Sequence, residues 1–305
     1  MGLLDDKVVI VTGAGRGIGR GEALEFARQG AAVVVNDYGA NVHGENPRSE
    51  TADAVVAEIQ ALGGEAVANA DDVADWDGSK RLIHTAIEHF GRLDAVVNNA
   101  GILRDRTLAN MEAEEWDSVI RVHLRGTFAM SRHAAAYWKD LAKSGEKLDA
   151  RIVNTSSGSG LYGNPGQSNY GAAKAAIASL TIIASQELLR YGVTVNAIAP
   201  TALTRMTDDR PFAQAYKELG EHEFNRLAPE NVAPLVVWLV SDAASDVTGR
   251  VFNVDGGRIS VAEPWIAGPE VDKGALWEVG ELDSVVPELL EKTRPVVTLK
   301  PVKTS

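Results

Sequence analysis

The sequence predicts an α/β fold in which a doubly wound parallel sheet of about seven strands carries helices on both faces. Short β-branched runs, such as 7–12 and 31–37, alternate with segments of helix length. Continuous apolar strands of this kind are typical of parallel sheets that are covered on both sides. With 305 residues and 45% hydrophobic content, the chain can also bury a large core.

The expected elements follow this alternation along the chain. Strands are predicted over 7–12, 31–37, 65–72, 93–98, 151–155, 193–198 and 250–254. Helices are predicted over 17–30 and 49–62 and from starts near Asp77, Glu112, Ser168 and Glu230. The helix over 49–62 is amphipathic and is followed by two glycines, which are typical of helix ends. Three tryptophans lie among the apolar residues of the helices and are expected in the core: Trp116, Trp138 and Trp238.

Three stretches interrupt the alternation. Residues 38–48 are polar and rich in glycine and asparagine, so we expect a loop there. Residues 201–225 are rich in charge and contain Pro211, which indicates a lid or specificity loop over a cleft. The sheet pattern stops after Gly257, so we assign residues 1–257 to a single domain and residues 258–305 to a C-terminal extension.

The C-terminal extension is expected to contain one short helix over about 283–292. Its apolar stripe would consist of Leu282, Val285, Val286, Leu289 and Leu290. An apolar stripe on so short a segment calls for a partner surface. We therefore expect the extension to pack on the same or a neighbouring subunit.

Composition excludes several classes of function. The net charge is −12, with 42 acidic against 30 basic residues, so we expect no nucleic-acid partner. The chain has no cysteine, which excludes disulfides and thiolate metal sites and is consistent with a reducing compartment. The six histidines show no metal-ligand spacing, so we expect no metal.

The sequence carries no recognisable targeting signal. No basic segment followed by a long apolar run opens the chain, and no run of about 18 apolar residues predicts a membrane span. Gly2 lacks the serine or threonine that myristoylation prefers, and residues 301–305 are not a peroxisomal Ser-Lys-Leu signal. We therefore expect a cytoplasmic location.

A glycine-rich turn, TGAGRGIG over 12–19, joins the first strand to the first helix. Glycines there allow a tight turn and a close approach to a phosphate, and the helix N-terminus supplies positive potential. A tight turn without a ligand is the alternative. Because the strand–turn–helix context is complete, we predict a dinucleotide site. Its cofactor-binding residues are expected to be Thr12, Gly13, Arg16, Gly17, Ile18 and Gly19.

Asp37 closes the second strand, 18 residues after Gly19. A carboxylate at this place accepts hydrogen bonds from the adenosine ribose and repels a 2′-phosphate, which favours NAD over NADP. Arg16 is a base that would tolerate such a phosphate, so NADP remains the less favoured alternative. At two further strand ends, Asp72 and Val73 would border the adenine, and Asn99, Ala100 and Gly101 would contact the cofactor.

Tyr170 and Lys174 stand four residues apart on a predicted helix, thirteen residues after Ser157. Residues with this spacing share one helix face. The unperturbed phenol pKa of about 10 makes tyrosine a poor base at neutral pH, and a neighbouring ammonium favours the phenolate. A serine hydroxyl nearby would hold a substrate oxygen. These groups, together with a dinucleotide site, are suited to moving a proton and a hydride in one reaction.

These motifs together resemble the short-chain dehydrogenase/reductase family over residues 5–257. The resemblance is carried by TGAGRGIG, NNAG (98–101), Ser157, YGAAK (170–174) and NAIAP (196–200). It implies a Rossmann-like fold and NAD(P)-dependent interconversion of an alcohol and a ketone. It further implies that Tyr170 is the general acid/base, that Lys174 lowers its pKa and binds the nicotinamide ribose, and that Ser157 orients the reacting oxygen. Ser156 fits the family spacing less well.

The sequence departs from the family pattern at two places. His123 stands where many members have an asparagine whose backbone carbonyl holds a relay water, so His123 is either part of that relay or a packed helix histidine. The usual Pro-Gly after the sixth strand is Pro200-Thr201. The resemblance implies that Pro200 keeps a backbone contact to the carboxamide and that Thr204 is a phosphate or amide ligand.

A narrower resemblance, to the (3R)-hydroxyacyl-CoA dehydrogenase unit of peroxisomal multifunctional enzyme type 2, rests on four segments. They are GILRDR (101–106), RVHLRG (121–126), YGNPGQSNY (162–170) and NVAPLVVWL (231–239). It implies a stand-alone relative that oxidises a (3R)-hydroxyacyl-CoA with NAD. Arg104 and Arg106 would then either steer a CoA phosphate or form a solvated loop pair.

Three alternatives remain open at this point. The chain would otherwise be a 17β-hydroxysteroid dehydrogenase, a 3-oxoacyl-carrier-protein reductase, or a non-enzymatic NAD-binding sensor. The intact set of Ser157, Tyr170 and Lys174 speaks against the sensor. The resemblance also implies that the helices near 112–140 and 168–190 pair across subunits, so we expect a homodimer or homotetramer.

Overall fold

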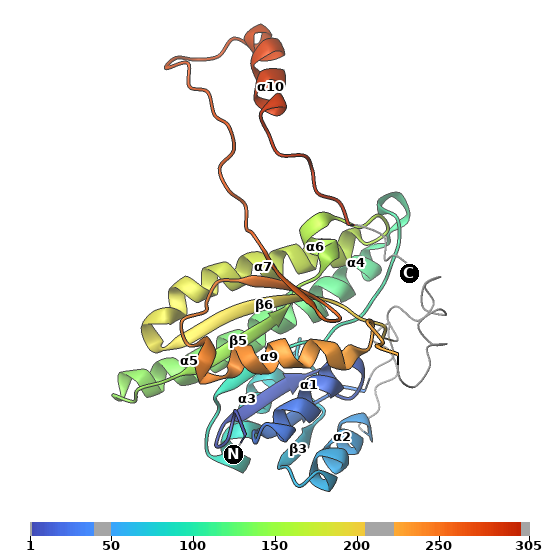
Figure 1. Cartoon of the computed structure of the whole chain (residues 1–305), viewed down its shortest axis with the longest axis vertical. Coiled ribbons are helices and arrows are strands. Elements are labelled where there is room, and N and C mark those ends of the chain that lie inside the picture. Colours follow the sequence, from blue (N-terminus) through green and yellow to red (C-terminus); the bar gives the residue numbers. More distant parts are fainter. Residues whose placement is uncertain (1, 40–49, 205–222, 300–305) are drawn as a thin grey trace.

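The computed structural model describes residues 2–39, 50–204 and 223–299. Its centre is one eight-stranded sheet in the order β3-β2-β1-β4-β5-β6-β7-β8 (Figure 1). The strands are β1 (Val8–Thr12), β2 (Ala32–Asn36), β3 (Ala66–Asn69), β4 (Ala95–Asn98), β5 (Ala150–Thr155), β6 (Val193–Thr201), β7 (Val251–Asp255) and β8 (Arg258–Ala262). All neighbours are parallel except β7 and β8.

The eighth strand corrects the expectation that the sheet pattern stops after Gly257. β8 pairs antiparallel with β7 from Asp255↔Arg258 to Val251↔Ala262. Gly256, with φ +58°, belongs to the tight turn between the two strands. Four of the five residues of β8 are exposed, and Ile259 and Val261 are among them. A strand without a buried run lacks the signal that reveals the inner strands, so sequence reasoning missed it.

Helices cover both faces of the sheet, as the sequence predicts, and one further helix, α10, stands away from it (Figure 1). They are α1 (Gly17–Arg28), α2 (Glu50–Ala61), α3 (Trp76–Phe90), α4 (Ala113–Ile120), α5 (Gly126–Lys143), α6 (Gly158–Tyr162), α7 (Ser168–Leu188), α9 (Ala233–Val240) and α10 (Leu282–Glu291). Helices α1, α2 and α9 bury their apolar residues in one core cluster. Helices α3 and α5, with the end of α7, bury theirs in a second cluster on the opposite face. The fold is therefore an α/β doubly wound, Rossmann-like fold.

The tryptophan expectation is right at one position and wrong at two. Trp138 is fully buried, and its indole N–H donates to the Leu93 carbonyl at 2.7 Å. Trp116 on α4 and Trp238 on α9 are 39% and 40% exposed, respectively. Helical periodicity places a side chain on an apolar face, but it does not say whether another element of the same chain covers that face.

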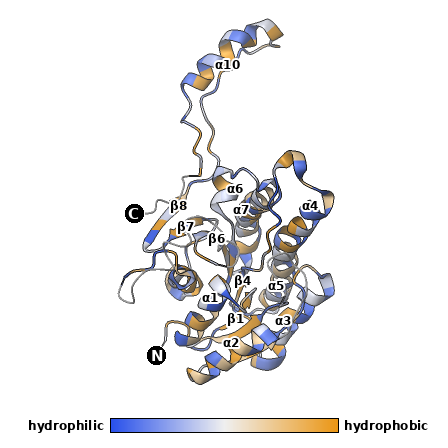
Figure 2. Cartoon of the chain, turned by 90° about the vertical axis from the view of Figure 1, so that its right-hand side faces the viewer, coloured by the Kyte–Doolittle hydropathy of each residue, from blue (hydrophilic) through white to orange (hydrophobic). Residues whose placement is uncertain are grey.

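Beyond β8, the C-terminal extension projects from the body of the molecule (Figures 1 and 2). One extended segment without regular secondary structure leads out to α10, and a second leads back. The expected helix is thus present, within one residue of its predicted start. No residue of α10 is buried, and Leu290 and Leu276 of the extension are strongly exposed. The chain then returns to the body, where the Leu299 side chain lies beside Gly158.

One helical stretch among the described residues, Ser168–Tyr191, is long and apolar enough to cross a membrane by length and composition. Its buried face includes Lys174, Ile177 and Thr181, and α7 packs against β6 and α6. We therefore interpret it as a core helix of the domain. The expected loop 38–48 and the expected lid 201–225, with Pro211, lie largely outside the described residues.

Candidate active site

The glycine turn lies at the carboxyl edge of the sheet, between β1 and α1. Gly13 and Gly17 have positive φ angles of +65° and +54°, a region that glycine adopts without strain. A Cβ on Gly13 would lie 2.8 Å from the Ala100 Cα, so this close approach of two backbones also requires glycine. The N-cap residue of α1, Arg16, makes no side-chain cap, which leaves the first amides of the helix for an anion.

Asp37 follows β2 directly and faces the glycine turn. Its carboxylate accepts from the Gly15 N–H at 2.8 Å and from the Gly39 N–H at 2.6 Å. A Cβ on Gly15 would lie 2.6 Å from the same carboxylate. The negative charge is therefore held in one place beside the turn, as an acid that selects the adenosine ribose must be.

The segment after β4 is tied to the end of β1. The Thr12 hydroxyl accepts from the N–H groups of Asn99 at 3.0 Å and Ala100 at 3.1 Å, and it donates to the Val97 carbonyl at 3.2 Å. The Asn99 amide donates to the Thr12 carbonyl at 2.9 Å. Strands β1 and β4 flank the point where the strand order reverses, which is where doubly wound sheets bind dinucleotides.

The remaining predicted cofactor contacts fall into two groups. Thr204 lies over the turn, because a Cβ on Gly17 would be 3.4 Å from its methyl group, and Pro200 lies near the end of β6. Asp72 is paired with Arg121 at 2.5 Å, and Val73 is buried in the second core cluster. The glycine turn, Asp37 and the Asn99 loop, which is hydrogen-bonded to Thr12, together fit a nicotinamide dinucleotide.

Ser157, Tyr170 and Lys174 come together at the ends of β5 and α7. Lys174 is buried, and its ammonium donates to the Thr155 carbonyl at 2.5 Å and lies 5.5 Å from the centre of the Tyr170 ring. The Tyr170 hydroxyl is hydrogen-bonded to the Ser157 side chain. The fully buried Ser156 hydroxyl donates to the Lys174 carbonyl at 2.8 Å. Ser156 is thus committed to the backbone of α7, and Ser157 is the serine at Tyr170.

Burial dominates the electrostatics of Tyr170 and Lys174. Burial raises the pKa of Tyr170 to about 12, which outweighs the hydrogen bond from Ser157, and the charge of Asp105 raises it further. Burial also lowers the pKa of Lys174 to about 7. In the protein alone, both groups are therefore driven toward their neutral forms.

His123 is buried in a five-residue π-helical segment, η2 (Arg121–Arg125), between α4 and α5. Its Nε2 lies 2.8 Å from the Ile102 carbonyl oxygen, and its ring meets the Tyr170 ring edge-on at 5.1 Å. Burial lowers the pKa of His123 to about 3, so the ring is neutral at physiological pH. The side chain of His123 is therefore packed, whereas the relay that the resemblance implies would run through its backbone carbonyl.

Sequence reasoning missed three residues around Tyr170, namely Asn169, Gln167 and Asp105. Asn169 donates to the carbonyls of Arg104 and Glu115, both at 2.9 Å, and accepts from the Tyr170 N–H at 2.7 Å. Gln167 donates to both carboxylate oxygens of Asp105, at 2.9 and 3.1 Å. The partners are more than fifty residues apart in sequence, so no local pattern signals them.

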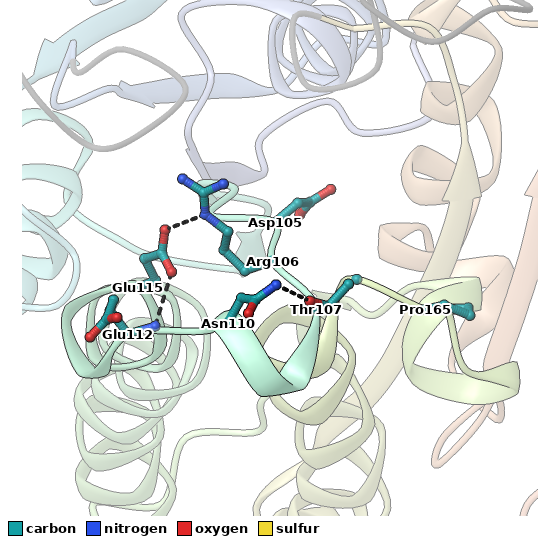
Figure 3. A pocket seen from close by; sticks show the side chains of 8 residues that line it. Asp105, Arg106, Thr107, Asn110, Glu112, Glu115 and Pro165 are labelled. Atoms are coloured by element: carbon teal, nitrogen blue, oxygen red, sulfur yellow. Dashed lines mark hydrogen bonds and ion pairs between the residues drawn. The ribbon is translucent and has the colours of Figure 1, made fainter.

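An open pocket of about 660 Å³ adjoins this group (Figure 3). It is lined by Asp105, Arg106, Thr107, Asn110, Glu112, Glu115, Pro165 and Gly166. Arg106 donates to Glu115 at 3.0 Å, so its charge is already paired. Three carboxylates against one guanidinium make the pocket acidic. Ser157 and Tyr170 do not line it.

Comparison with known proteins now defines the class of the chain. The profile of the short chain dehydrogenase family matches residues 7–214. The chain belongs to this family of oxidoreductases, which act on CH–OH groups and bind a nicotinamide dinucleotide. The family expected from the motifs and the fold class is confirmed.

Individual relatives have more specific names than the family. Hydroxyacyl-CoA dehydrogenase ChsB1 of Mycobacterium tuberculosis is 44% identical over 290 residues, which cover 93% of this chain and 88% of that protein. Peroxisomal multifunctional enzyme type 2 of the mouse is 46% identical over 255 residues, which cover 84% of this chain and 32% of that protein. A crystal structure of a short chain dehydrogenase from Mycobacterium avium is 55% identical, with a TM-score of 0.88 over 99% of this chain and 100% of that one.

Proposed function

We propose that the protein is an NAD-dependent dehydrogenase that oxidises a (3R)-hydroxyacyl-CoA to the 3-oxoacyl-CoA. The observation that carries the reaction type is the meeting of Ser157, Tyr170 and Lys174 beside a dinucleotide turn. The similarity to a hydroxyacyl-CoA dehydrogenase and to a multifunctional enzyme supports the substrate class.

In this proposal the protein residues act on the reacting oxygen. Tyr170, as the phenolate, takes the proton of the substrate hydroxyl, and Ser157 holds the same oxygen by a hydrogen bond. Lys174 contacts the nicotinamide ribose and, when charged, favours the phenolate. The bound cofactor supplies the hydride acceptor. The residues that would hold its phosphates are Thr12, Gly13, Arg16, Gly17, Ile18 and Gly19, with Thr204 as a further phosphate or amide ligand.

The substrate assignment is tested by steady-state NAD reduction with four compounds at equal concentration. They are a (3R)-hydroxyacyl-CoA, its (3S) isomer, a 17β-hydroxysteroid and the free 3-hydroxy acid. We expect the largest kcat/KM for the (3R)-thioester. Preference for the steroid would move the function to ring-hydroxyl oxidation, and reduction of a 3-oxoacyl carrier protein with NADPH alone would make the chain a carrier-protein reductase.

The preference for NAD is assigned to Asp37. Replacing it by asparagine (Asp37→Asn) keeps the shape but removes the charge that would repel a 2′-phosphate. We expect the ratio of kcat/KM for NADP to that for NAD to rise about 10-fold or more, the equivalent of about 1.4 kcal/mol. Asp246→Asn, at an exposed position far from the turn, is the matched control. An unchanged ratio in Asp37→Asn would remove Asp37 from cofactor selection.

We further propose a cytoplasmic homo-oligomer. Trp116 on α4, Phe128 on α5 and Ile183 on α7 are exposed large apolar side chains on the helices that were expected to pair across subunits. The extension 258–305 adds an exposed apolar helix, α10, that stands clear of its own subunit (Figure 2). A second copy of the chain is the partner that would cover the apolar side chains of α4, α5 and α7 and the helix α10. Light scattering on the full chain tests this assembly against the 32.5 kDa of a single chain.

A further inference from the structure

We propose that His123 is a positioning residue whose ring joins the cofactor loop at 99–102 to Tyr170. The inference rests on the proposed role of Tyr170 and adds a residue whose side chain does not itself transfer a proton. It is carried by three contacts of one buried side chain: to the backbone of Ile102, to the space left open by Gly101, and to the ring of Tyr170.

The first contact holds the loop. The His123 Nε2 lies 2.8 Å from the Ile102 carbonyl oxygen and 3.1 Å from the Ile102 nitrogen. We assign the ring proton to Nε2, because the carbonyl oxygen is the closer neighbour. Among the described residues, Nδ1 has no hydrogen-bond partner. The imidazole is therefore bonded through Nε2 alone, to Ile102, which lies in the loop that begins with Asn99 and Ala100.

The second contact explains the glycine of the NNAG motif. A Cβ on Gly101 would lie 2.3 Å from Cε1 of His123 and 3.1 Å from both ring nitrogens. Only glycine leaves room for the imidazole at this point. The other end of the same loop is bound by the Thr12 hydroxyl through the N–H groups of Asn99 and Ala100. The loop is thus held between the dinucleotide turn and His123.

The third contact reaches the proposed base. The rings of His123 and Tyr170 are 5.1 Å apart and nearly perpendicular at 87°, the edge-to-face geometry that aromatic pairs prefer. Lys174 approaches the same tyrosine with its ammonium 5.5 Å from the ring centre. Tyr170 therefore contacts both Lys174 and His123, with Ser157 at its hydroxyl. The neutral His123 adds no charge to this site.

Two variants separate the contacts. His123→Phe keeps an aromatic ring for Tyr170 but loses the bond to Ile102, whereas His123→Gln keeps a donor for Ile102 but loses the ring. We expect His123→Gln to lower kcat about 10- to 100-fold, the cost of a misplaced reacting group, with little change in KM for NAD. His123→Phe should mainly raise KM for NAD. The matched control is His133→Gln on α5, a buried histidine whose ring lies 4.4 Å from the Trp76 ring of α3 at a tilt of 59°.

A readout that needs no substrate keeps this test apart from the proposed function. Protein labelled with ¹³C-tyrosine is compared by NMR with its Tyr170→Phe counterpart, which assigns the Tyr170 signal. We expect that signal to shift in His123→Gln and to stay near its place in His133→Gln at equal Tm. An unshifted Tyr170 signal in folded His123→Gln would overturn the proposal, as would equal losses of kcat in the two glutamine variants. Absence of turnover in the wild type would instead refute the proposed function.

Discussion

Replacing Tyr170 by phenylalanine (Tyr170→Phe) is expected to lower kcat for alcohol oxidation by about 10²- to 10⁴-fold, the usual contribution of a general base. Binding of NAD should be retained, because the phenyl ring keeps the edge contact with His123 and its place beside Lys174. His123 cannot replace the lost phenolate. With its pKa lowered to about 3, the buried imidazole is a very weak base. Steady-state rates and a fluorescence titration with NAD measure the two effects separately.

The pH profile decides between Tyr170 and the other titrating group in the site. Since the phenolate is the reactive form, kcat/KM for oxidation should rise with pH in the wild type, and the rise should disappear in Tyr170→Phe. Burial lowers the pKa of Lys174 to about 7. If Tyr170→Phe kept substantial turnover, with a rise centred near pH 7, the proton would be assigned to Lys174. Tyr162→Phe, on α6, is the control for loss of a phenol elsewhere.

Replacing Glu22 by glutamine (Glu22→Gln) is expected to remove a large pH dependence of stability. Glu22 lies on α1, is fully buried, and both its oxygens lack a hydrogen-bond partner among the described residues. Burial raises the pKa of Glu22 from 4.5 to about 8. Between these two values the folded state binds a proton that the unfolded state has released. The free energy of unfolding therefore falls as the pH rises, by about 1.4 kcal/mol per pH unit.

Glutamine is neutral at every pH and close in shape to the protonated acid. The Tm of Glu22→Gln should therefore approach or fall below that of the wild type near pH 5 and exceed it at pH 8. Thermal unfolding across this range measures the difference. Glu88→Gln, at an exposed position on α3, should show no such trend. A difference between Glu22→Gln and wild type that does not vary with pH would mean that Glu22 is already ionised in the folded protein.

Local chemistry in the sequence was sufficient for much of the site. The glycine turn, the carboxylate of Asp37 and the four-residue spacing of Tyr170 and Lys174 each follow from a short segment and its own backbone geometry. The inner strands were equally visible, because a strand buried on both faces must be a continuous apolar run. The seven predicted strands therefore appear in the structure at nearly their expected positions, whereas the exposed strand β8 does not obey that rule.

Only the tertiary structure decided what the site residues experience. Burial, which sets the directions of the pKa shifts of Tyr170 and Lys174, depends on every element packed around them. The hydrogen bond from the Ser156 hydroxyl to the Lys174 carbonyl joins β5 to α7, and the place of the His123 ring depends on a loop twenty-one residues away. Residue types and spacings thus determined the family and the chemistry available to the protein. Contacts between distant segments decided which groups meet and how strongly they are charged, because electrostatic and packing energies depend on distance in space.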